Sequence, residues 1–387
     1  MTAYGLLSVI LALYLSEVGL SPQRIGLLLT LTLAGDTVIS LWMTTSADRR
    51  GRRKMLVGGA LLMVFAGVLF ALTRDFGLLL VAAVIGVISP SGNEVGPFLS
   101  IEQASLAHLV PGSKRTKVFA WYNLAGSFAM AAGTLVGGGL AQWLRAFELT
   151  PLAGYRAIVV VYAAIGVGLA LLFLGLSPGV EAGPKADPRV AGSFLGLHRS
   201  RAIVFKLAGL FGLDAFAGGF VMQSLLVYWF HIRFGLDPGR LGAIFFGANI
   251  LAGISALSAA RLASRFGLIN TMVFTHLPSN VLLVLLPLMP NAWLSVLVLL
   301  LRFAISQMDV PTRQAYTVSV VEPDERSAAA GITGIARTVG AGLSPLIVGA
   351  LFASPALVNV PLFLAGGLKI VYDLALYRSF RATEPRE

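Results

Sequence analysis

The sequence predicts an all-α integral membrane protein with about twelve transmembrane helices in two pseudo-symmetric six-helix bundles. The first observation behind this prediction is composition: of 387 residues, 57% are hydrophobic and only 12% are charged, with a mean hydropathy of +0.83. Soluble globular proteins carry about 25% charged residues. Composition therefore excludes a soluble enzyme and a disordered chain, and the lack of cysteine excludes a disulfide scaffold.

The second observation is a series of apolar runs that are long enough to cross a bilayer, which takes about 20 residues. These runs must be helical, because lipid offers no hydrogen-bond partner to the backbone. The first run lacks a basic segment ahead of it, so we expect a retained span rather than a signal peptide. The runs lie near residues 4–20, 22–45, 55–73, 77–106, 117–142, 154–176, 201–230, 241–263, 271–290, 292–320, 327–353 and 357–377.

The third observation is an internal repeat. Gly19–Gly26 returns as Gly235–Gly242, 216 residues later, with five identities in eight positions. Such turn sequences also recur by chance, but both copies join the first two spans of their half, which favours duplication and parallel repeats. We expect a six-helix bundle at 1–176, a cytoplasmic linker at 177–199 and a second bundle at 200–387.

The formal charge of +11 reflects membrane topology rather than nucleic-acid binding. Most Lys and Arg residues lie in the even-numbered connections and at the C-terminus, five of them within residues 49–54. By the positive-inside rule we expect both termini in the cytoplasm, in a multi-pass protein of the plasma (inner) membrane.

The loop after the second span, Thr44–Lys54, resembles the signature loop of the major facilitator superfamily, with Thr44 in place of its first Gly. The resemblance covers the whole chain through its spans, linker and repeat. It implies a cytoplasmic latch that holds the outward-facing state, with Ser264 in the acidic position of the second copy. The latch residues that it implies are Asp48, Arg49, Gly51, Arg52 and Arg53. The alternative for the cations of this loop is a role in topology only.

The fifth span partly resembles a signature of exporters in the superfamily, at Ala129, Gly133, Thr134, Gly137 and Gly138. The first Gly and the Pro of that signature are missing. Small residues at this spacing also allow two helices to pack closely without any role in transport. The pattern favours export only weakly.

Ionisable residues inside spans are costly and are therefore candidates for function. Glu94 and Glu102, beside Asn93 and Gln103, occupy a Gly- and Pro-interrupted stretch of the fourth span. Interrupted helices are typical of transporter binding sites, and a buried carboxylate suits a proton carrier.

The second half has a counterpart in its tenth span, where Gln307, Asp309 and Arg313 surround Pro311, and a further carboxylate, Asp214, in its seventh. Asp309 and Arg313 are four residues apart, so they could instead form a local structural pair, as could Lys369 and Asp373. His276 is a weaker candidate.

We expect a secondary transporter that moves a small organic solute by alternating access, coupled to protons and with export favoured. The alternatives are a lipid-handling or non-transporting relative and, from another class, a membrane-embedded enzyme. The sequence contains no His-Glu-x-x-His pair, Gly-x-Ser-x-Gly elbow or P-loop, which disfavours an enzyme or an ATP-driven pump. We expect no catalytic residue, cofactor, metal or nucleic-acid partner, and a monomer in the lipid bilayer.

Overall fold

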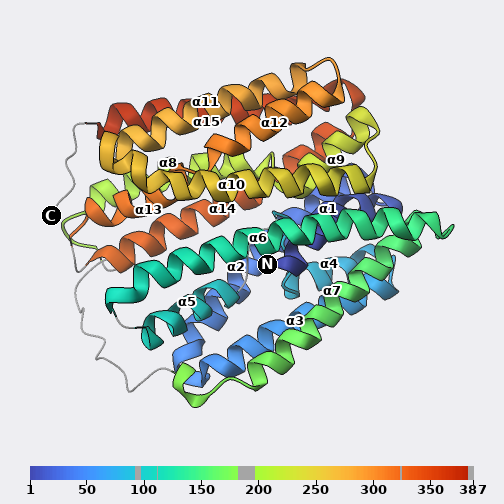
Figure 1. Ribbon diagram of the computed structural model, residues 1–387, viewed down its shortest axis with the longest axis horizontal. Coiled ribbons are helices and arrows are strands. Elements are labelled where there is room, and N and C mark those ends of the chain that lie inside the picture. The colour runs from blue at the N-terminus through green and yellow to red at the C-terminus, as the bar shows by residue number, and fades with distance from the viewer. Residues whose placement is uncertain (92–96, 111, 182–196, 323–324, 382–387) are drawn as a thin grey trace. The chain divides into compact units, whose positions relative to one another are not determined.

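The computed structural model describes residues 1–91, 97–110, 112–181, 197–322 and 325–381, and its elements are helices (Figure 1). The first half contains α1 (Thr2–Glu17), α2 (Pro22–Arg50), α3 (Arg52–Leu72), α4 (Phe76–Ile85), α5 (Pro97–Leu109), α6 (Gly112–Ala146) and α7 (Pro151–Leu174). The second half contains α8 (Arg201–Gly219), α9 (Gln223–Phe234), α10 (Pro238–Phe266), α11 (Leu268–Leu285), α12 (Ala292–Ser306), α13 (Asp309–Ser319), α14 (Arg326–Phe352) and α15 (Val360–Phe380).

Within the described residues, ten helical segments are long and apolar enough to cross a membrane, and two shorter apolar helices, α1 and α4, accompany them. This confirms the prediction of an all-helical, multi-span membrane protein with about twelve spans. The predicted interruptions of the fourth and tenth spans are present, between α4 and α5 and between α12 and α13. The seventh span is also broken, between α8 and α9, which the sequence analysis missed although Gly218 and Gly219 precede the break.

The chain forms two compact units. Unit 1 comprises residues 1–186 and 222–246, and unit 2 comprises residues 187–221 and 247–387. In unit 1, α1 packs against α6, α7 and α9, and α3 packs against α7; in unit 2, α8 packs against α14 and α15, and α11 against α12, α13 and α15. The domain boundaries at 176 and 200 stay a prediction, because most of the linker lies outside the described residues.

The repeat in sequence is also a repeat in backbone conformation. Gly19 and Gly235, 216 residues apart, both have positive φ, at 99° and 65°. Each is followed by a helix cap: the Ser21 hydroxyl accepts from the backbone N–H of Arg24 at 3.4 Å, and Asp237 accepts from that of Arg240 at 2.9 Å. A left-handed turn costs glycine little, and the polar caps satisfy the first helical N–H groups. These loops therefore start α2 and α10 in the same way.

Glycines bring α1 and α6 into close contact. A Cβ atom on Gly133 or Gly137 would collide with the carbonyl oxygen of Thr2 or Leu6. In unit 2 a Cβ on Gly340 of α14 would likewise collide with the carbonyl oxygen of Gly212 on α8. The small residues of the partial exporter signature thus serve helix packing, the alternative considered above.

Candidate functional site

Asp214 of α8 is the centre of a buried charge network in unit 2. Its side chain is 5% exposed, and its carboxylate binds three cations from three other helices. Lys369 of α15 lies 2.5 Å from Oδ1, while Arg313 of α13 and Arg337 of α14 lie 3.3 and 3.2 Å from Oδ2. One carboxylate therefore joins α8 to three helices whose contacting residues lie 99, 123 and 155 residues further along the chain.

Asp309 and Arg313 form the ion pair that their spacing allows, with Nη1 and Oδ2 2.7 Å apart. The same Nη1 also reaches Asp214, and the guanidinium lies over the ring of Phe211, 5.6 Å from its centroid. The pair is therefore part of the larger network rather than an isolated local contact.

The interpretation of Lys369 and Asp373 as a local pair is wrong. Lys369 binds Asp214, whereas Asp373 accepts a hydrogen bond from Asn280 at 2.8 Å and lies 2.8 Å from Nδ1 of His276. The other ring nitrogen of His276 is 3.9 Å from Asp214 Oδ1. The imidazole thus lies between two carboxylates, so His276 belongs to the same network as the predicted site residues Asp214, Asp309 and Arg313.

Glu102 of α5 lies in a separate cavity of unit 1. The cavity has a volume of about 340 Å³, and the side chains of Tyr4, Phe98 and Phe173 form aromatic parts of its wall. The hydroxyl of Tyr122, on α6, donates a hydrogen bond of 2.5 Å to the carboxylate. An acid in a mostly apolar pocket is typical of a site for a small organic molecule.

The structure shows fewer contacts for the other predicted site residues. Gln103 is half-buried beside Glu102, and Gln307 lies in the break between α12 and α13, where its backbone N–H donates to the Ser255 hydroxyl at 3.3 Å. Asn93 and Glu94 lie outside the described residues. Their role in the substrate or proton site stays a prediction.

The signature loop contacts the residues that follow α7. Glu181 accepts hydrogen bonds from the backbone N–H groups of Arg52 at 2.6 Å and Arg53 at 3.3 Å, which caps the N-terminus of α3. The Arg52 guanidinium also donates to the carbonyl oxygen of Val180 at 3.4 Å. Sequence analysis missed Glu181, because nothing in its neighbourhood marks a cap for a helix that begins 129 residues earlier.

Gly51 has a φ of 102° and connects α2 to α3. Asp48 and Arg49 belong to α2, but their side chains lie outside what the structure describes. The latch of Asp48, Arg49, Gly51, Arg52 and Arg53 stays a prediction.

Glu325, just before α14, caps the N-terminus of α8. It accepts from the backbone N–H groups of Arg199 and Ser200, each at 2.8 Å, and contacts His198. Burial by itself raises the pKa of this carboxyl group, but the hydrogen bonds from Ser200 and His198 outweigh burial and hold the pKa below its ordinary value.

We expect Glu325→Gln to lower the thermal unfolding midpoint of the purified protein at pH 7. Because the folded-state pKa is lowered, the ionised carboxylate stabilises the fold above the ordinary glutamate pKa of about 4.3 and loses this effect as the pH falls below it. The difference between wild type and variant should therefore shrink on acidification. Glu17→Gln, at an exposed position, is the control. A difference that is independent of pH would contradict the assignment.

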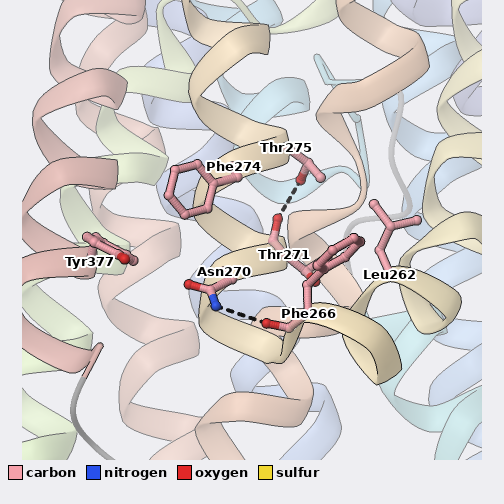
Figure 2. Close-up of a pocket in the computed structure, with 7 residues that line it drawn as sticks. All are labelled: Leu262, Phe266, Asn270, Thr271, Phe274, Thr275 and Tyr377. Atoms are coloured by element: carbon pink, nitrogen blue, oxygen red, sulfur yellow. Dashed lines mark hydrogen bonds between the residues drawn. The ribbon is translucent and has the colours of Figure 1, made fainter.

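A cavity of about 430 Å³ in unit 2 contains none of the predicted site residues. Figure 2 shows its wall, formed by Leu262, Phe266, Asn270, Thr271, Phe274, Thr275 and Tyr377. Asn270 donates to the carbonyl oxygen of Phe266 at 2.9 Å and Thr275 to that of Thr271 at 2.7 Å, so these polar groups are satisfied within the chain. The network at Asp214 and the cavity at Glu102 are therefore the better candidates.

Comparison with known proteins places this arrangement in a family. The chain is 30% identical to the uncharacterized membrane protein YJR124C of Saccharomyces cerevisiae, over 99% of this chain and 92% of that protein. It is 21% identical to the quinolone resistance protein NorA of Staphylococcus aureus, over 95% and 90% of the two chains. A crystal structure of a D-xylose–proton symporter matches with a TM-score of 0.74 at 14% identity, over 97% of this chain and 94% of that one.

The sequence profile of the Major Facilitator Superfamily matches residues 1–345, most of the chain. Members of this superfamily are transporters of small molecules rather than enzymes. The match confirms the resemblance seen in the signature loop and the duplicated architecture. The chain belongs to the major facilitator superfamily of secondary membrane transporters.

Proposed function

We propose that the protein exports a small organic solute across the plasma membrane in exchange for protons, by alternating access. Both termini face the cytoplasm in this proposal. The observation that carries the proposal is the buried carboxylate of Asp214, bound by Lys369, Arg313 and Arg337. Ion pairs inside a bilayer are costly, and where they occur they mark ion and proton pathways.

Protonation of this network has a mechanical consequence. Three cations hold Asp214 in its ionised form, so a proton can bind to it only when Lys369 and Arg337 move away, and protonation and weaker contacts of α14 and α15 with α8 therefore occur together. His276 lies between Asp214 and Asp373 and offers a path for the proton between them. Proton binding is thereby linked to the arrangement of helices within unit 2, which is the link that a coupled transporter needs.

Glu102 supplies a second titratable group in unit 1. Its cavity is of a size for a small organic molecule, and the carboxylate and Tyr122 are polar groups in a mostly apolar wall. Support for export comes from the likeness to NorA, whose name denotes quinolone resistance, at 21% identity along nearly the whole chain.

The test is transport by the full-length protein in vesicles that contain an internal pH dye. A panel of organic solutes is offered with and without an imposed pH gradient. Uphill solute movement that follows the gradient, together with proton movement in the opposite direction, is the expected result. If the flux of every transported solute in the panel is independent of the pH gradient, proton coupling is refuted. If protons move in the same direction as the solute, exchange is refuted.

A further inference from the structure

Arg302 of α12 is a buried cation that forms no salt bridge with the residues that the structure describes. The residue is 8% exposed, and its Nε has no hydrogen-bond partner within the described part of the chain. Ser306, one turn further along the same helix, is 3% exposed, and its hydroxyl also lacks a partner there. Residues four apart lie on the same helix face, and Arg302 and Ser306 belong to the buried stripe of α12. Two hydrogen-bond donors are thus buried side by side and unused.

The charges around Asp214 leave no carboxylate for Arg302. Asp214 is shared by three cations, Asp309 binds Arg313, and Asp373 is bound by His276 and Asn280. Asp214 and Asp309 lie within electrostatic reach of Arg302. His276 apart, the described network therefore contains three acids and four bases. The acids are Asp214, Asp309 and Asp373, and the bases are Arg302, Arg313, Arg337 and Lys369.

This excess of positive charge indicates the kind of ligand that the site could bind. An unpaired buried charge and an unpaired buried hydroxyl both raise the free energy of the folded protein. A guanidinium offers donors in a fixed planar fork that suits a carboxylate or phosphate group, and a serine hydroxyl offers one more. An oxyanion would satisfy both residues and balance the network, whereas a cation would add to the excess.

The location fits a ligand as well. Ser306 is the last residue of α12, and Gln307 and Met308 interrupt the tenth span before α13 begins at Asp309. Interrupted transmembrane helices are where transporters of several folds place their ligands. The two unused donors therefore lie at the C-terminal end of α12, beside a helix interruption of the kind at which transporters bind ligands.

We propose that Arg302 and Ser306 form a subsite for the oxyanion of the transported solute, a carboxylate or a phosphate. The proposal rests on the proposed transport function and specifies the substrate class as organic anions. Arg302 provides the charge and the planar contact, and Ser306 provides a neighbouring hydroxyl donor. Arg313, Arg337 and Lys369 remain bound to the carboxylates of the network.

Equilibrium binding to the purified full-length protein in detergent tests the subsite without any gradient. Benzoate and phenyl phosphate are the anionic probes, and benzamide is the neutral probe of the same shape as benzoate. We expect at least one anion to bind and to raise the thermal unfolding midpoint, with benzamide at least tenfold weaker than benzoate if benzoate binds. The tighter of the two anions identifies the oxyanion.

Arg302→Gln is expected to weaken binding of that anion at least tenfold, and Ser306→Ala severalfold. Arg261→Gln, which removes an exposed arginine of α10, should bind as wild type does. If Arg302→Gln does not fold, Arg302→Lys keeps the charge but removes the fork, and should still weaken binding. Wild-type affinity in the folded Arg302 variant, or binding of neither anion, would overturn the proposal. Because no pH gradient enters the assay, its failure is distinct from a failure of proton coupling.

Discussion

Replacement of Asp214 with asparagine is expected to lower the stability of the protein by about 3–5 kcal/mol, the usual cost of leaving a buried charge without its partner. Arg313 keeps Asp309, and the side chain of Arg337 is 35% exposed, so solvent can compensate it. Lys369, whose side chain is 9% exposed, loses the carboxylate that it binds. The measurement is the thermal unfolding midpoint of the purified protein, together with gradient-driven transport, which should be lost.

A second substitution tests whether the unpaired charge of Lys369, rather than the new side chain at position 214, causes the loss of stability. If the unpaired Lys369 ammonium causes the instability, Asp214→Asn combined with Lys369→Met should regain much of the lost midpoint while transport stays abolished. Asp237→Asn, at a helix cap outside the network, is the control for removal of an acid. An additive double variant, less stable than either single one, would contradict the direct pairing of Asp214 with Lys369.

Replacement of Glu102 with glutamine is expected to abolish uphill transport driven by a pH gradient and to leave downhill exchange in place. Glutamine has the shape of the neutral acid, and its side-chain oxygen can still accept the hydrogen bond of Tyr122. It cannot carry a proton. The measurement is solute accumulation and exchange in vesicles of matched protein content.

Tyr122→Phe serves as the companion variant, because it removes the hydrogen bond but keeps the acid. It should retain uphill transport with an altered pH dependence, and Glu17→Gln should behave as wild type does. Full uphill transport by Glu102→Gln would remove Glu102 from the coupling mechanism. Glu94 and Asp214 would then be the remaining carboxylates to test.

The sequence alone was enough to predict the architecture, because each clue is local. A hydrophobic span needs only about 20 consecutive apolar residues. The turn that begins α2 depends on Gly19 and Ser21, and its copy before α10 on Gly235 and Asp237; each turn joins the first two spans of its half, as predicted. The interruptions of the fourth and tenth spans could be read from Gly and Pro within the runs.

Side-chain partners were predicted only where they lie within one helical turn. Asp309 and Arg313 pair as their spacing allows, but the same spacing suggested a wrong partner for Lys369, which binds Asp214, 155 residues away. Glu181, Glu325 and Arg302 gained their significance in the same way, from neighbours or missing neighbours that no local pattern specifies. The bilayer requires a run to be apolar, but the packing of one helix against another decides which buried charges meet, and that packing exists only in the folded chain.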